Sequence, residues 1–96
     1  MKSYSFLPEA EEELIDALSR SRNPIKFNRR VVKVIDDIAS GRVQYPLHGK
    51  TKARECLLRP IPYSLIYVDS GNDIRIYAVA HHKRRPGYWK SRLKKS

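Results

Sequence analysis

The chain has 96 residues, enough for one small domain, and we predict a single domain over residues 1–96. Its 20 Lys and Arg residues against 10 Asp and Glu residues give a net charge of +10. No window approaches the roughly 20 apolar residues that a membrane-spanning helix needs, and the single cysteine, Cys56, excludes an intramolecular disulfide. We therefore expect a cytoplasmic protein with no membrane segment.

The positive charge is concentrated in the C-terminal half. Residues 1–48 carry eight cations and seven anions, whereas residues 49–96 carry twelve cations and three anions. The segment from His81 to the end has seven cations and no carboxylate, which predicts an anionic partner such as nucleic acid, the ribosome or an acidic polypeptide. For Lys94 and Lys95 a solvated tail is the alternative. The prediction of an anionic partner fails for any cation of the segment from His81 onward that pairs with a carboxylate of the protein itself.

The N-terminal half predicts one strand followed by two helices. Residues 3–7 alternate polar and apolar side chains, which is typical of a short strand, and Pro8 ends it. An acidic first turn and an apolar face then predict a helix that fades near residues 19–22. Asn23 caps a second amphipathic helix, which Ser40-Gly41 ends. The short link between the two helices predicts an antiparallel hairpin.

The C-terminal half predicts a three-stranded meander. Residues 41–53 have no sustained period and form a loop, and strands follow over residues 54–59, 62–69 and 73–80. Residues 88–93 suggest a short terminal helix. The first strand must join an edge of this sheet, because a lone strand cannot satisfy its own backbone. The expected fold class is α+β: a two-layer β-α-α-β-β-β domain with a helical hairpin packed on a mostly antiparallel four-stranded sheet.

The last strand has two different faces if its side chains alternate strictly. One face holds Ile74, Ile76, Ala78 and Ala80, and the other holds Arg75, Tyr77, Val79 and His81. A helical hairpin covers only one face of a sheet. We therefore expect the helices on the face of Ala78 and Ala80, and an opposite face that is open to solvent or reserved for a ligand.

Five segments carry a resemblance to a known family. They are F-L-P-E-A-E-E-E-L at 6–14, F-N-R-R-V-V-K-V-I-D-D-I at 27–38, Y-P-L-H-G at 45–49, L-L-R-P-I-P-Y-S-L-I-Y at 57–67 and A-V-A-H-H-K-R-R-P-G-Y-W at 78–89. In order and spacing the chain resembles the ParE/RelE superfamily of bacterial type II toxins, sometimes labelled plasmid stabilisation proteins. The resemblance implies a growth-inhibiting toxin with no cofactor, neutralised by a cognate acidic antitoxin that wraps it.

Two activities divide this superfamily. ParE-like members poison DNA gyrase by binding it, whereas RelE-like members cut messenger RNA on the ribosome without a metal. The RelE-like pattern places cations at positions that here hold Glu55, Leu57 and Ser64. The resemblance therefore favours the ParE-like branch. His82 and Tyr88 match the rest of the RelE-like set, and they are the candidate catalytic residues only if the toxin is RelE-like.

Seven further residues are candidates for binding nucleic acid or another target. They are Arg54, Arg59, His81, Lys83, Arg84, Arg85 and Trp89. Structural roles are the alternatives. Of His81 and His82, one ring would cap backbone groups at the strand end and the other would face solvent; Tyr88 and Trp89 would pack on the sheet; Arg54 and Arg59 would be solvated strand ends or antitoxin contacts. Three histidines and one cysteine make no metal-ligand set, so we predict no metal. A non-toxic basic module that binds nucleic acid or the ribosome is a further functional alternative.

Overall fold

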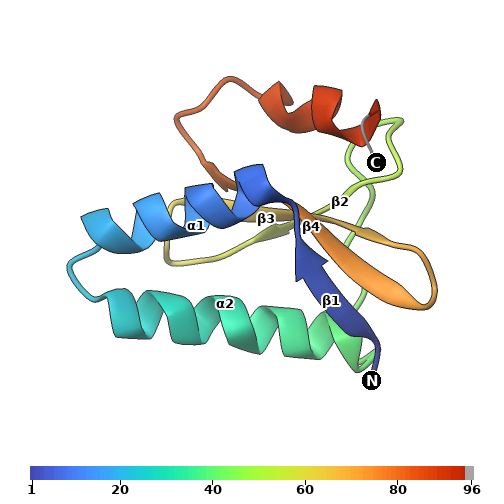
Figure 1. Cartoon of the computed structure of the whole chain (residues 1–96), viewed down its shortest axis with the longest axis horizontal. Helices are drawn as coiled ribbons and strands as arrows, with labels where there is room; N and C mark the ends of the chain where they lie inside the picture. The colour runs from blue at the N-terminus through green and yellow to red at the C-terminus, as the bar shows by residue number, and fades with distance from the viewer. Residues whose placement is uncertain (95–96) are drawn as a thin grey trace.

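The computed structural model describes residues 1–94 and has the predicted element order (Figure 1). The elements are β1 (Ser3–Phe6), α1 (Pro8–Arg20), α2 (Pro24–Ala39), β2 (Arg54–Leu57), β3 (Tyr63–Asp69), β4 (Asp73–His81) and the 3₁₀ helix η1 (Tyr88–Lys94). The α+β class is confirmed, and the element bounds lie within about two residues of the predicted ones. The largest difference is β2, which ends at Leu57 because the chain turns at Pro60 into β3.

The four strands form one mixed sheet in the order β1-β4-β3-β2. β4 pairs antiparallel with β3, and β3 pairs antiparallel with β2, as a meander requires. β1 joins the free edge of β4 in parallel, with Phe6 opposite Ile76. The predicted edge position of the first strand is therefore confirmed, and it places the start of α1 beside the middle of β4.

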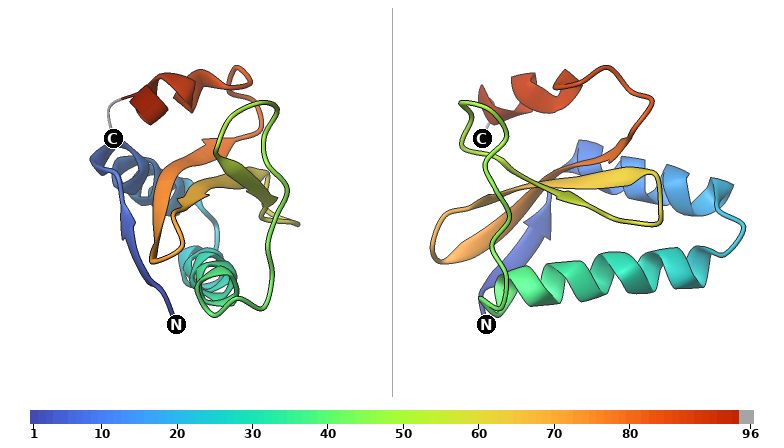
Figure 2. Two further views of the ribbon diagram at one scale, coloured as in Figure 1. Left: turned by 90° about the vertical axis from the view of Figure 1, so that its right-hand side faces the viewer. Right: turned by 180° about the vertical axis from the view of Figure 1, so that it is seen from behind.

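The two helices form the predicted hairpin and pack on one side of the sheet. The Asn23 side chain accepts a hydrogen bond from the backbone N–H of Lys26 at 3.0 Å, and Pro24 occupies the first turn of α2. Ala10 and Ala17, both buried, let α1 approach β4 closely. The 3₁₀ helix η1 lies on the opposite side of the sheet from α2 (Figure 2). Within residues 1–94, no helix is both long and apolar enough to cross a membrane.

A β-bulge in β4 changes which residues face the helices. Ile66 pairs with Ala78, but the next residue of β3, Tyr67, pairs with Ile76. Tyr77 is therefore an extra residue that has no partner on β3. An extra residue of this kind reverses the inward and outward alternation of the strand on its two sides.

The predicted face assignment is wrong beyond this bulge. Val79 and His81 line a hollow with residues of α1, so their face is the one that the helices cover. Ala80 lies on the other face, where it lines a cleft with Trp89 of η1. That second face is not open to solvent around Ala80, because η1 packs on it and leaves Ala80 only 8% exposed. The other alternative, a face reserved for a ligand, stays a prediction. Strict alternation failed here because one inserted residue carries no sequence signal of its own.

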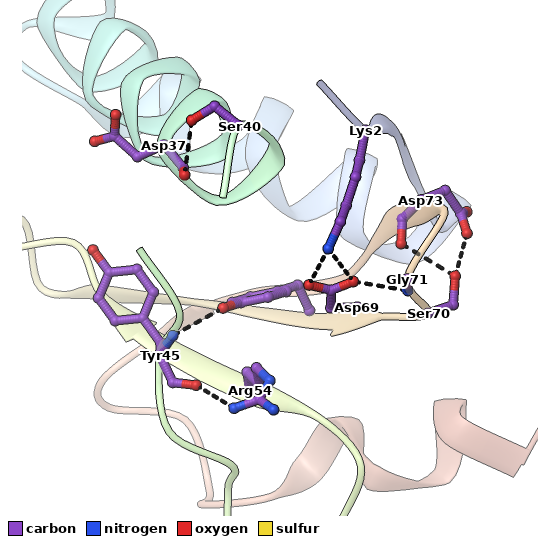
Figure 3. Close-up of polar contacts among 10 residues, drawn as sticks. Lys2, Asp37, Ser40, Tyr45, Arg54, Asp69, Ser70, Gly71 and Asp73 are labelled. Carbon is purple, nitrogen blue, oxygen red and sulfur yellow. Dashed lines mark hydrogen bonds and ion pairs between the residues drawn. The ribbon is translucent and has the colours of Figure 1, made fainter. Parts of the chain in front are cut away.

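An ion pair ties the N-terminus to the β3–β4 turn (Figure 3). Lys2 Nζ lies 2.9 and 2.8 Å from the two carboxylate oxygens of Asp69, and the N–H of Gly71 donates to the same carboxylate at 2.9 Å. The bond from Lys2 lowers the pKa of Asp69, although burial partly opposes this. The ionised carboxylate is therefore favoured more in the folded chain than in the unfolded chain.

We expect Lys2→Ala to lower the free energy of unfolding by about 1 kcal/mol at neutral pH, since the pair is only partly buried. A carboxyl with a lowered folded-state pKa stabilises the fold above its unfolded pKa, and this contribution is lost as the pH falls through the folded pKa. The difference between the wild type and Lys2→Ala in urea titrations should therefore disappear below the ordinary pKa of Asp69, 3.8. A difference that grew on acidification would contradict the assignment.

Candidate functional site

A cleft of about 340 Å³ opens where β4 ends, between the sheet and the segment that leads into η1. We call it the strand-end cleft. Its walls come from β2, β3, the end of β4 and the turn before η1, and the loop between α2 and β2 adds His48. The residues that matter for its chemistry are His48, Glu55, Leu57, Arg59, Ser64, His82, Arg84, Arg85, Tyr88 and Trp89.

The five positions that the RelE-like pattern singled out meet in this cleft. Glu55 and Leu57 lie on β2, Ser64 on β3, His82 after β4 and Tyr88 at the start of η1, and all five line it. His82 Nε2 lies 3.1 Å from Ser64 Oγ, in hydrogen-bond contact. Ser64 is 2% exposed, so the exposed His82 is in contact with a buried hydroxyl in the wall of the cleft.

Tyr88 is held by an acidic residue of α1. Its hydroxyl donates a hydrogen bond to Glu13 Oε2 at 2.6 Å. Burial raises the pKa of Tyr88, and the bond to the Glu13 carboxylate raises it further. The phenol therefore keeps its proton at physiological pH, and that proton is directed at Glu13.

Glu13 joins three elements of the fold through the same carboxylate. Arg92 of η1 forms a two-bond pair with it, at 2.9 and 3.0 Å, and the backbone N–H of Val79 on β4 donates to it at 3.1 Å. Arg92 also donates to the carbonyl of Tyr77 at 2.9 Å. The side chains of Glu13 and Arg92 are only 15% and 14% exposed. Sequence reasoning missed this role, because an acidic residue in the first two turns of a helix already has a local explanation.

The basic C-terminal segment is partly neutralised by the protein itself. Arg92 is paired with Glu13, and Arg84 stacks over the ring of Tyr88 at 3.8 Å with its guanidinium 3.9 Å from the Glu13 carboxylate. The prediction of a freely available basic segment is therefore wrong for Arg92, and it is wrong in part for Arg84, which is half-exposed but faces the same carboxylate. Arg85 is exposed, and among residues 1–94 no carboxylate pairs with it.

The predicted tail is described only in part. Lys94 is exposed at the end of η1, and Lys95 lies outside the described residues.

Trp89 forms part of the wall rather than an open stacking surface. The indole is 2% exposed and packs edge-to-face on His48, with ring centroids 4.9 Å apart. His48 Nε2 lies 3.7 Å from Glu55 Oε1, and its buried Nδ1 has no hydrogen-bond partner in the described part of the chain. Sequence reasoning missed His48, because nothing in the pattern of residues 41–53 shows that this loop folds back beside β2.

The predicted binding residues do not all meet. The cleft brings together Arg59, His81, Arg84, Arg85 and Trp89. Arg54 instead contacts the loop after α2, where its guanidinium donates a hydrogen bond to the carbonyl of Tyr45 at 2.7 Å (Figure 3).

His81, which lines the cleft, is the last residue of β4, and Lys83 follows two residues later. His81 Nδ1 accepts a hydrogen bond from the backbone N–H of Lys83 at 3.0 Å, and its ring packs on Tyr63. This is the capping role given as an alternative for one of the two histidines. Lys83 itself lies on the helical side, where it lines a second hollow.

Comparison with solved structures shows which fold this is. The chain is similar to one from the chromosomal ParDE toxin-antitoxin system of P. aeruginosa, with a TM-score of 0.69 and 15% identity, covering 84% of this chain and 96% of that chain. It is also similar to a copper-bound mutant toxin from Helicobacter pylori, with a TM-score of 0.66 and 18% identity, covering 85% and 96% of the two chains. At these identities the likeness shows a shared fold. In residues 1–94, no group of three metal-ligating side chains comes together.

The sequence itself matches the model of a family described as ParE toxin of type II toxin-antitoxin system, parDE, over residues 4–86. The chain therefore belongs to the ParE toxin family, and it is a type II toxin of the ParE/RelE superfamily. No match was found among curated protein sequences.

Proposed function

We propose that this toxin inhibits growth in the bacterial cytoplasm by binding DNA gyrase, and that a cognate acidic antitoxin neutralises it. Residues 1–96 act as one domain in this proposal. The observation that carries it is the side-chain set of the strand-end cleft. The three positions at which RelE-like ribonucleases carry cations hold Glu55, Leu57 and Ser64, and all three line the cleft.

Cleavage of RNA by its own 2′-hydroxyl needs a base for that proton and cations for the phosphate charge that develops. The Glu55 carboxylate instead places a negative charge on the wall beside any bound phosphate. Tyr88 stays protonated, and its hydroxyl donates a hydrogen bond to Glu13. The cleft is therefore better suited to binding than to phosphoryl transfer.

The charge of the rim supports a protein partner with acidic residues. Arg59 and Arg85 are exposed at the cleft, and within the described chain neither pairs with a carboxylate. Arginine at a partly apolar rim favours carboxylate recognition through paired hydrogen bonds. Leu57, 41% exposed, supplies the apolar contact beside them.

Supercoiling of relaxed plasmid by purified gyrase tests the proposal directly. We expect the purified toxin to block supercoiling, and we expect messenger RNA from cells that make the toxin alone to stay intact. Heat-unfolded toxin at the same concentration is the control for nonspecific effects of a basic protein on DNA. Normal supercoiling together with abundant cleaved messages would rule the proposal out.

A ribosome-dependent ribonuclease is the second candidate, and the position of His82 favours it. This histidine is exposed and lies in the same cleft as Arg59 and Arg85, so a base and two cations face one hollow. If this function holds, primer extension on translated messages should show cleavages that His82→Ala removes. The third alternative, a harmless nucleic-acid or ribosome-binding module, would show no growth defect at high expression.

A further inference from the structure

The helical hairpin carries exposed apolar side chains on the side that faces away from the sheet. On α1, Ala10 and Ala17 pack toward β4, whereas Ile15 lies on the other side of the helix and is 60% exposed. On α2, Ile25 and Val32 are 71% and 40% exposed. A group of exposed apolar side chains on one surface is typical of an interaction site. We call this surface the outer hairpin face, and it consists of Glu11, Glu12, Ile15, Ile25, Arg29, Val32 and Lys33.

The two helices run antiparallel and side by side (Figure 1), so residues equally far from the three-residue link between them lie at one level. Glu11 lies nine residues from the near end of α1, and Lys33 lies nine residues from the near end of α2. Ile15 and Arg29 each lie five residues from those ends. Glu11 and Lys33 therefore share one level of the outer hairpin face, and Ile15 and Arg29 share another, nearer the link.

On this face α1 presents carboxylates and α2 presents cations. Glu11 and Glu12 of α1 are exposed, and so are Arg29 and Lys33 of α2. Within residues 1–94, Glu11, Glu12 and Arg29 form no ion pair, and Lys33 pairs with Asp37 through a side chain that is still 65% exposed. These two anions and two cations balance, whereas the whole chain carries +10. Two copies of the chain can therefore meet here without net repulsion between the contacting surfaces.

The arrangement of charge on the two helices is complementary to itself. When two copies are placed face to face, a twofold axis along the hairpin lays α1 of each copy on α2 of the other. Rotation about this axis leaves the level of every residue unchanged, so Glu11 of one copy meets Lys33 of the second copy, and this contact forms twice. Ile15 and Val32 lie within about one helical turn of each other along the same axis and supply the apolar contact beside these pairs.

The size of the face predicts a reversible contact. Helices of 13 and 16 residues are about 20 and 24 Å long, and neighbouring helices pack about 10 Å apart. Two helices of this length offer a face at the small end of specific protein–protein interfaces. We therefore expect a dissociation constant on the order of 10 µM, rather than an obligate dimer.

We propose that two copies of this toxin associate through the outer hairpin face as a symmetric dimer, with Ile15 and Val32 in its apolar part and two Glu11–Lys33 ion pairs beside them. A nucleic acid is disfavoured as occupant, because Glu11 and Glu12 repel its phosphates. An acidic peptide meets the same two carboxylates, and a basic peptide meets Arg29 and Lys33. A second copy of the chain is the occupant that offers opposite charge to both helices.

The proposed dimer leaves the strand-end cleft accessible. The 3₁₀ helix η1, which forms one wall of the cleft, lies on the opposite side of the sheet from α2 (Figure 2). Ile15, Ile25 and Val32 do not line the cleft. The dimer therefore presents two strand-end clefts to solvent. The inference goes beyond the proposed function and does not depend on it, because neither target nor antitoxin takes part in the contact.

Sedimentation of the purified full-length toxin tests self-association. The protein is measured in reducing buffer over a range from about 1 to about 300 µM, which spans the expected dissociation constant. We expect the weight-average mass to rise with concentration from 11.2 kDa toward twice that value. A mass that stays at 11.2 kDa over the whole range would overturn the proposal.

An apolar substitution locates the contact. Ile15→Glu is expected to weaken self-association at least about tenfold, because it places a carboxylate in the apolar part of the interface in both copies. Leu47→Glu is the matched control, since Leu47 is 51% exposed, lies on the loop before β2 and undergoes the same change in net charge. It should alter the dissociation constant less than about twofold. Equal effects of the two substitutions would place the contact elsewhere and overturn the proposal.

Exchange of charge between the two helices tests the symmetry of the contact. Glu11→Lys and Lys33→Glu are each expected to weaken self-association about tenfold, because each substitution makes two attractive contacts repulsive. An equimolar mixture of the two variants should recover the wild-type affinity, since both contacts of the mixed dimer again join opposite charges. Circular dichroism of each variant checks that the fold is retained.

A second mixture separates this pairing from attraction by net charge. Arg75→Glu changes the net charge by the same amount as Lys33→Glu, but Arg75 is exposed on β4, outside the outer hairpin face. Mixed with Glu11→Lys, it should recover only part of the affinity, because one of the two contacts still joins two lysines. Equal recovery in both mixtures would show attraction by net charge, and no recovery in either would exclude the Glu11–Lys33 contact. Either result would overturn the proposal.

Discussion

Glu13→Ala is expected to lower the free energy of unfolding by about 3 kcal/mol. The change leaves the Arg92 guanidinium, the Tyr88 hydroxyl and the Val79 N–H without their shared acceptor. Removing one partner of a buried pair costs more than the pair itself contributes, because the remaining charge stays buried and unpaired. Urea denaturation followed by circular dichroism measures the loss.

Glu12→Ala is the matched control. Glu12 is the preceding residue of the same helix, is exposed, and makes no hydrogen bond or ion pair in the described part of the chain. Its replacement should change the free energy of unfolding by less than about 0.5 kcal/mol. Glu13→Gln keeps an acceptor but loses the charge, so it should fall between the two. Equal stability of Glu12→Ala and Glu13→Ala would refute the central role of the Glu13 carboxylate.

Glu13→Ala should also change the strand-end cleft. Tyr88 and Trp89 form one wall of the strand-end cleft, and η1 is fixed to α1 and β4 through Glu13. Loss of this carboxylate should release η1 from the sheet before the rest of the domain unfolds. Increased tryptophan quenching by acrylamide at low urea would report that release, because Trp89 is the single tryptophan and is 2% exposed when η1 is docked.

The fold was predictable because each element carries a strong local signal. The apolar stripe of α2, its Asn23 cap and the Ser70-Gly71-Asn72 turn before β4 act over a few residues, and they set the element order. The edge position of β1 followed from the need to satisfy its backbone. Periodicity and hydrogen-bond satisfaction were therefore sufficient for the architecture.

The candidate site was predictable only in part, because its contacts join residues that are far apart in sequence. Glu13 meets Val79, Tyr88 and Arg92 across separations of 66, 75 and 79 residues, and no local pattern specifies which cation a carboxylate will meet. The bulge at Tyr77 had the same effect on the sheet, since one unpaired residue exchanged its two faces. The resemblance supplied Glu55, Leu57, Ser64, His82 and Tyr88 of the strand-end cleft, and charge and residue type supplied its arginines and Trp89, whereas the partners of these residues came only from the structure.

Arg85→Glu and Arg59→Glu are each expected to reduce gyrase inhibition at least about tenfold if the strand-end cleft binds the target. Both guanidinium groups are exposed at its rim and unpaired in the described chain, so their reversal should leave the fold intact. The measurement is the toxin concentration that halves supercoiling by purified gyrase. Urea denaturation of each variant checks that stability is retained.

Arg75→Glu is the control that separates the position of the charge from its amount. Arg75 is exposed near the start of β4 and does not line the cleft. Each of the three variants replaces one cation by one anion, so each lowers the net charge from +10 to +8. Long-range attraction between toxin and target depends on net charge, whereas docking depends on where each cation stands. Equal losses in all three variants would therefore place the target elsewhere on the surface, while a loss confined to Arg59 and Arg85 would locate it at the end of β4.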